Sequence, residues 1–270
     1  MTMPRLVVCA DDFALSRPIS ETIATLAREG RINAVSCMAV CPGWARDAGL
    51  LHELPAHVQV GLHVTLTGEA PLTDMPEYVP AGGAMPGIDP LTAAAAKGDL
   101  PLEEIAGEID AQFRAFRKAM GCAPDFVDAH QHAHVLPGIR SLFLDAVAEH
   151  APGAWVRDCG DRVSAIAARP WRGKAIGSAY HARGLRRAAA RRGIACNSSF
   201  AGHYDFRGDY ERIFPTFLRR PGTMHLIMCH PGAGELPGDD IAGARPREAA
   251  ALHRMRIADM ARAHGLEFDA

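Results

Sequence analysis

The sequence has no long apolar run, few aromatic residues and no excess of charge of one sign. The apolar stretch near its start, residues 6–10, is ended by two aspartates, whereas a membrane-spanning helix needs about 20 apolar residues. We therefore expect no membrane span, no export signal and a cytoplasmic location. Aromatic residues make up 6% of the chain and the formal net charge is −2. Both values argue against a surface built to bind nucleic acid or anionic membrane.

Paired cysteine motifs are also lacking. The seven cysteines form no Cys-x-x-Cys pair, and their number is odd. In a chain for which no export signal is expected, this pattern predicts reduced and mostly buried thiols rather than disulfides.

The 270 residues have the composition of a globular protein with a large core, since 48% are hydrophobic and 22% are charged. Short apolar runs alternate with amphipathic stretches, which predicts a parallel sheet, open or closed into a barrel. The expected strands are 6–10, 32–40, 58–65, 126–129, 155–157, 194–196 and 224–229. The expected helices are 16–28, 44–51, 101–121, 138–150, 176–192 and 247–264. We predict one α/β domain over residues 1–270.

One connection in this pattern is unusually long. Residues 68–100 are rich in proline, glycine and alanine. A connection of this length predicts a functional lid or an irregular excursion.

Potentially reactive side chains recur where the expected strands end, and most are histidines, of which the chain has 13. In parallel α/β proteins the carboxyl edge of the sheet is where sites form. The four strand ends concerned carry Asp11 and Asp12, then His63, then the run 128–134, and finally His230. Taken singly, the aspartate pair could be a helix cap or a solvated turn, and each lone histidine could be a hydrogen-bonded core residue.

The histidine run is less common. In a strand, alternate residues share a face, so His130, His132 and His134 could align. Three histidines on one face are costly unless ligands or hydrogen-bonding partners occupy them. The run is followed by Leu136 and Pro137, which predicts a bend, so we do not expect all three to bind one ion.

Together these groups suggest a metal site. One carboxylate and two imidazoles are a common ligand set for a divalent ion with open coordination positions. A second carboxylate and an uncoordinated histidine are then candidate general base and general acid. These groups together are suited to metal-assisted hydrolysis, but they do not specify the bond that is cleaved.

Four blocks of the sequence resemble the YdjC-like carbohydrate deacetylases, the family of the chitooligosaccharide deacetylase and the hopanoid-associated sugar deacetylase. They are Ala10-Asp-Asp-Phe13, Gly61-Leu-His63-Val-Thr-Leu-Thr67 with Pro71-Leu72-Thr73, Asp128-Ala-His-Gln-His-Ala-His134-Val-Leu-Pro137 and Met228-Cys-His230-Pro-Gly232. The blocks follow the order of the family and extend from residue 6 to about residue 232. The family usually has glycine after Asp-Asp-Phe, whereas this chain has Ala14, which is strained if the position needs a positive φ.

The resemblance implies a single-domain distorted (β/α) barrel with mostly parallel strands. It also implies one divalent ion, with Mg²⁺ favoured and Zn²⁺ or another transition metal as the alternative. Asp12, His63 and His130 are the implied ligands, Asp11 the general base and His230 the general acid. His132 and His134 then belong to the pocket or lie behind the ligands.

The favoured function is removal of an N-acetyl group from an amino sugar or oligosaccharide. The alternatives are a metal-dependent hydrolase of another amide or an ester bond, and a metal- or sugar-binding protein without turnover. We expect a small carbohydrate substrate and no nucleic-acid partner. For the oligomeric state, a homodimer is one option that the sequence leaves open. The basic residues in 183–192 are either a solvated helix face or a clamp for an anionic substrate.

Overall fold

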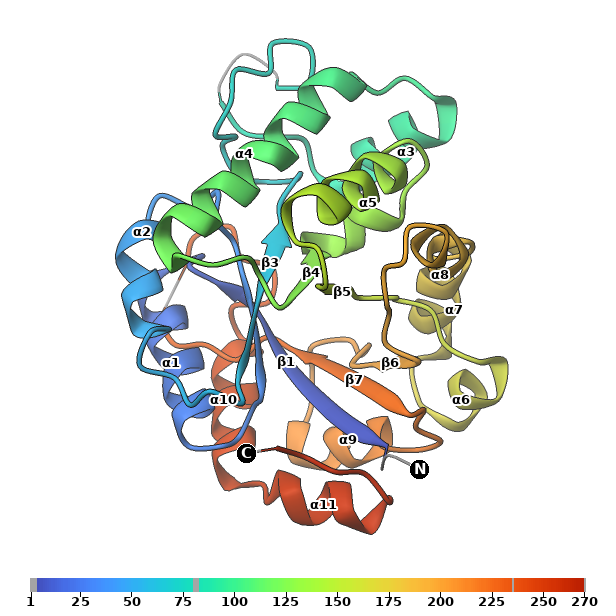
Figure 1. Ribbon diagram of the computed structural model, residues 1–270. Helices are drawn as coiled ribbons and strands as arrows, with labels where there is room; N and C mark the ends of the chain where they lie inside the picture. The colour runs from blue at the N-terminus through green and yellow to red at the C-terminus, as the bar shows by residue number, and fades with distance from the viewer. Residues whose placement is uncertain (1–3, 80–82, 235, 270) are drawn as a thin grey trace.

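The computed structural model describes residues 4–79, 83–234 and 236–269. Its centre is a seven-stranded sheet in the order β5-β4-β3-β2-β1-β7-β6, and every neighbouring pair is parallel. The strands are β1 Arg5–Phe13, β2 Ala34–Cys37, β3 Gln59–Val64, β4 Phe126–Ala129, β5 Trp155–Val156, β6 Ser199–Ala201 and β7 Met224–Cys229. The sheet curls into a half-barrel, with β1 and β7 crossing its middle (Figure 1). The predicted α/β barrel-like fold is confirmed.

The two outer strands approach each other across the open side of this half-barrel. A single bridge joins Val156 to Cys196, and Asn197 links the two sides. Its side chain accepts from the Asp158 amide at 2.6 Å and donates to the carbonyls of Asp158 and Ser199, both at 3.0 Å. The segment predicted as strand 194–196 therefore makes only this bridge, and β6 begins at Ser199.

Helices surround the sheet (Figure 1). The longer ones are α1 Arg17–Arg28, α3 Ile88–Lys97, α4 Leu102–Met120, α5 Ile139–His150, α7 Arg172–His181 and α10 Arg245–Arg254. The shorter ones are α2 Trp44–Asp47, α6 Val163–Ala168, α8 Leu185–Ala190, α9 Tyr210–Phe217 and α11 Ile257–Ala263, with 3₁₀ turns η1 Ala48–Leu50 and η2 His130–Val135. None of these helices combines the length and apolar character that crossing a bilayer requires.

Several predicted helices are divided in the structure. The predicted helix 176–192 is two helices, α7 and α8, separated at Gly184 with φ +85°. The predicted helix 247–264 is likewise α10 followed by α11, and α10 begins two residues earlier, at Arg245. Helices α3, α6 and α9 were not predicted. All seven cysteines are free, and five of them are buried.

The long excursion is anchored by α4. Glu108 is fully buried and accepts hydrogen bonds from the amides of Leu72 and Thr73, at 3.0 and 2.9 Å, and from the Thr73 hydroxyl at 2.8 Å. The second half of the excursion contains α3, and residues 80–82 lie outside the described part of the chain. The excursion is therefore partly helical and is held against α4.

The carboxyl end of β1 has an unusual backbone. The pairing of β1 with β2 is interrupted between Ala10 and Phe13, and Asp12 has φ +65°. Ala14 has φ +79° and is buried, with its amide donating to the Ser20 hydroxyl at 3.1 Å. The residue that replaces the family's glycine thus adopts the conformation that glycine tolerates best.

Strain at Ala14 predicts an unusual response to substitution. Ala14→Gly should change the free energy of unfolding by less than about 0.5 kcal/mol, because relief of the left-handed conformation offsets the loss of a buried methyl group. The matched variant Ala34→Gly, at a fully buried position in β2, should lose about 1–2 kcal/mol. Urea unfolding measures both values, and equal losses contradict the interpretation.

Candidate functional site

The side chains predicted from the sequence meet at the carboxyl edge of the sheet. There they line a cavity of about 1030 Å³. One wall comes from the excursion and α3, with Glu69, Ile88 and Asp89, and another from α7, with Lys174 and Ser178. Asp11, Asp12, His63, His130 and His230 all line this cavity.

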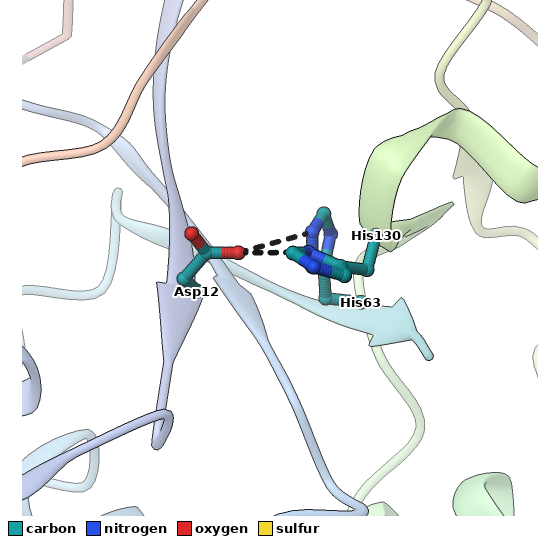
Figure 2. A group of neighbouring side chains, drawn as sticks. All are labelled: Asp12, His63 and His130. Atoms are coloured by element: carbon teal, nitrogen blue, oxygen red, sulfur yellow. Dashed lines mark hydrogen bonds and ion pairs between the residues drawn. The ribbon is translucent and has the colours of Figure 1, made fainter. Parts of the chain in front are cut away.

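Three of the predicted residues form a compact group (Figure 2). Asp12 Oδ1 lies 3.1 Å from His130 Nδ1 and 3.6 Å from His63 Nε2. The residues come from β1, β3 and the start of η2, so the fold brings together positions far apart in the chain. Asp12 and His63 are buried, whereas His130 is partly exposed to the cavity.

The geometry of this group suits a divalent ion. Its three ligand atoms lie within 4.8 Å of one another. Ligand atoms bound about 2.1 Å from an ion at tetrahedral angles are about 3.4 Å apart, close to the two measured separations. The two imidazoles favour Zn²⁺ or another transition metal over Mg²⁺, which prefers oxygen ligands.

A contact at Nδ1 fixes the orientation of the His63 ring. Its Nδ1 lies 2.5 Å from Asp128 Oδ1, to which the Ser36 hydroxyl also donates at 2.5 Å. A carboxylate on one imidazole nitrogen leaves the other nitrogen available as a ligand, which is the usual support of a metal-binding histidine. Burial favours the neutral acid, but the charges of Arg157 and His63 outweigh it and lower the pKa of Asp128 to about 2.

Behind Asp11 lies a fully buried guanidinium. Arg157 Nη1 and Nη2 donate to the two oxygens of Asp11, both at 2.6 Å, and Nη2 lies 2.5 Å from Asp128 Oδ2. Burial opposes the charge of Arg157, but the two carboxylates outweigh this effect and raise its pKa. The sequence pattern predicts a strand over 155–157 and does not indicate this role for Arg157. A charged residue at a strand end was the only signal available.

On the other side of Asp11 lies His230, directly after β7. Its Nε2 is 3.8 Å from Asp11 Oδ2, and its ring contacts the Phe206 ring edge-on at 5.5 Å between centroids. The side chain is 14% exposed. Asp11 and Asp12 thus have different neighbours, since Asp11 lies with Arg157 and His230 and Asp12 with the two histidines and Arg245.

The three histidines do not share one face, because the chain bends within the run, earlier than at Leu136 and Pro137. Strand β4 ends at Ala129, and in the 3₁₀ segment η2 Gln131 and His132 have φ of +50° and +60°. The three histidines consequently diverge. His132 lines the cavity, whereas His134 is buried behind it and its Nε2 donates to the Arg157 carbonyl at 2.8 Å. Burial lowers the pKa of His134 to about 4.

The basic residues of 183–192 lie elsewhere. Arg186 pairs with Asp158 at 2.8 Å and Arg192 with Asp145 at 2.7 Å. Among the described residues that line the cavity, none belongs to 183–192. This arrangement favours the solvated face over the anion clamp.

Removal of the Arg157 guanidinium should lower the free energy of unfolding of the protein. Arg157→Met leaves Asp11 and Asp128 buried without their cation, and we expect a loss of about 3–5 kcal/mol in the free energy of unfolding. Arg192→Met, which removes a surface ion pair with Asp145, should lose less than about 1 kcal/mol. Urea unfolding of both variants measures the difference. Similar small losses would show that Arg157 does not organise the site.

Three comparisons with known proteins bear on this geometry. Chitooligosaccharide deacetylase from Proteus mirabilis is 37% identical to this chain over 148 residues, which are 54% of this chain and 56% of that protein. The enzyme of the same name from Yersinia enterocolitica is 39% identical over 137 residues, or 51% of this chain and 53% of its own length. This chain therefore spans about half the length of these relatives.

A solved structure is also similar to this chain. A crystal structure from Enterococcus faecalis V583, of a protein provisionally named a cellobiose-phosphate cleavage protein, has a TM-score of 0.77 and 16% identity. The match covers 99% of this chain and 97% of that one, and at this identity it shows the fold alone. A family model described as YdjC-like protein matches residues 5–263. With nearly the whole sequence matched, the chain belongs to the YdjC-like family.

Proposed function

We propose that this protein is a metal-dependent hydrolase, one domain over residues 1–270, that removes an N-acetyl group from an amino sugar or oligosaccharide. The observation that carries the proposal is the group Asp12, His63 and His130 in one cavity with Asp11 and His230. The relatives named chitooligosaccharide deacetylase support the choice of an acetylated amino sugar.

Asp12, His63 and His130 would hold the ion. Family resemblance favours Mg²⁺, whereas the two imidazole ligands favour Zn²⁺ or another transition metal. A divalent ion in this position would polarise the amide carbonyl and lower the pKa of water.

Asp11 is suited to act as the general base. It lies beside Asp12 in the chain but contacts Arg157 rather than the two histidines. Each carboxylate oxygen has two lone pairs, so the bidentate contact with Arg157 leaves Asp11 able to accept a proton from the attacking water. Arg157 restricts the rotation of this carboxylate and thereby holds it towards the cavity.

His230 is suited to act as the general acid. Amide cleavage requires protonation of the departing nitrogen, because an amide anion is a poor leaving group. The His230 imidazole borders the cavity and lies 3.8 Å from Asp11. The two groups proposed to exchange protons with the substrate therefore lie side by side.

The cavity has the size and lining for a carbohydrate. Its volume of about 1030 Å³ is at the upper end of the range for small-molecule sites. Its lining combines polar groups, including Glu69, Lys174 and Ser178, with the apolar ring of Phe206. Such a mixture offers hydrogen bonds to hydroxyl groups and an apolar face for a sugar ring.

Acetate release tests the proposed function. Metal-free protein is incubated with a panel of N-acetylated amino sugars and oligosaccharides, with and without Zn²⁺, Mn²⁺ or Mg²⁺. We expect acetate only when an ion is present. Release of acetate from aryl esters alone would support the other hydrolase function. Sugar binding without any release would support a binding protein, and release without an ion would exclude the metal site.

A neutral amide at position 11 should separate catalysis from ion binding. Asp11→Asn keeps the shape of the side chain but cannot take a proton, so turnover should fall by about 100-fold or more while metal content stays unchanged. Elemental analysis of the purified variant and its rate of acetate release check this. Loss of the ion in Asp11→Asn would mean that the roles of Asp11 and Asp12 are reversed.

Replacement of His230 should affect substrates according to their leaving groups. His230→Ala should strongly reduce release of acetate from an N-acetyl sugar but largely spare an aryl acetate, whose phenolate leaves without protonation. Metal content and melting temperature should remain near those of the unsubstituted protein. If the amide and ester rates fall by the same factor in a stable variant that retains its ion, the assignment of the acid is wrong.

A further inference from the structure

The first turns of α10 carry two buried charged side chains outside the predicted site residues. Arg245 and Glu248 are three residues apart and therefore lie on one face of the helix. Both are buried, with Glu248 fully so. Each reaches a different part of the candidate site.

Arg245 contacts a proposed metal ligand. Its Nη2 donates to Asp12 Oδ2 at 2.8 Å, and its Nε donates to Asp239 Oδ2 at 2.6 Å. The contact occupies the oxygen of Asp12 that faces away from the histidines and leaves Oδ1 towards His63 and His130. A second group bound to a ligating carboxylate fixes its orientation.

Glu248 contacts the backbone of the proposed acid. Its Oε2 accepts the His230 amide at 2.6 Å, and its Oε1 accepts the hydroxyl of Tyr204. The Tyr204 ring packs on Phe206 at 4.8 Å between centroids, and Phe206 in turn packs against the His230 ring. Glu248 thus holds both the backbone of His230 and the aromatic residues beside its imidazole.

The segment after His230 also rests on this helix. The Gly232 amide donates to the Arg245 carbonyl at 3.2 Å. A Cβ on Gly232 would lie 2.9 Å from Ile19 Cγ1 and 3.2 Å from Arg245 Cδ. Only glycine allows this close approach, so residues 230–232 are held tightly against α10.

We propose that Arg245 and Glu248 are positioning residues with separate tasks: Arg245 orients Asp12 for the ion, and Glu248 holds His230 beside Asp11. This inference rests on the proposed function. It makes α10 the element that keeps the ion-binding and proton-donating parts of the site aligned. A merely structural role for the helix predicts that both substitutions reduce every property together.

Two variants and a control test this division. Arg245→Met should weaken binding of Zn²⁺ to the metal-free protein by about 10- to 100-fold, as measured by titration calorimetry, without changing the ratio of amide to ester hydrolysis at saturating ion. Glu248→Ala should keep Zn²⁺ affinity within about twofold and lower that ratio by about tenfold or more, as expected when a general acid is misplaced. Glu248→Gln, which retains an acceptor for the His230 amide, should restore most of the ratio.

The matched control is Arg254→Ala, at the end of the same helix, where Arg254 pairs with Glu211 on the surface. It should change neither property. The proposal is overturned if Arg245→Met binds Zn²⁺ normally, or if the amide-to-ester ratio of Glu248→Ala is that of the unsubstituted protein. If Glu248→Ala does not fold, Tyr204→Phe, which removes one of the two contacts of Glu248, should show a smaller change of the same sign.

Failure of the proposed function gives a different result. In that case the unsubstituted protein hydrolyses no N-acetyl sugar, yet Zn²⁺ titration of Arg245→Met still tests the first task. A crystal structure of Glu248→Ala then tests the second. We expect the His230 ring to leave its place beside Asp11 and Phe206, and an unmoved ring contradicts the proposal.

Discussion

A single buried guanidinium organises the carboxyl edge of this half-barrel. Arg157 follows β5 and pairs with Asp11 of β1 and Asp128 of β4. Through Asp128 the chain of contacts continues to His63 of β3, and from there to Asp12. Because isolated charges are costly to bury, each member needs its neighbours, and the four strands are held in one arrangement at this edge.

The charges buried around this edge do not balance. Asp11, Asp12, Asp128 and Asp239 pair with the guanidinium groups of Arg157 and Arg245, and the first three also contact histidine rings. Glu248 is a further buried carboxylate beside His230. Among the described residues at this edge, buried carboxylates therefore outnumber buried guanidinium groups. An ion beside Asp12, His63 and His130 would offset part of this excess and reduce the cost of burying the carboxylates.

Much of this site could be predicted from the sequence, because the strand ends carry local signals. Apolar runs followed by Asp11 and Asp12, and by His230, place those residues at the carboxyl edge without knowledge of the fold. Arg157 also follows an apolar strand, but its charge alone does not indicate its role, and Arg245 follows no strand. Their partners lie 146 and 233 residues away in the chain.

The sequence pattern also does not indicate the backbone conformation at two places. The alternating pattern would align the three histidines only in a strand, whereas β4 ends at Ala129, and Gln131 and His132 adopt left-handed conformations that separate the rings. The helix predicted over 176–192 is divided because α7 ends at His181 and α8 begins only after Gly184, whose positive φ does not occur inside a regular helix. In the excursion, the anchor Glu108 lies on α4, so the local composition of residues 68–100 could not reveal it.

The position of the ion is the most direct test of this account. Crystals grown with Zn²⁺ or Mn²⁺ and measured at the absorption edge of the metal would locate it by anomalous scattering. The account predicts one strong peak within about 2.0–2.2 Å of Asp12 Oδ1, His63 Nε2 and His130 Nδ1. A peak between Cys9, Asp11 and Asp128 in place of Arg157, or no peak in protein that still releases acetate, would contradict it.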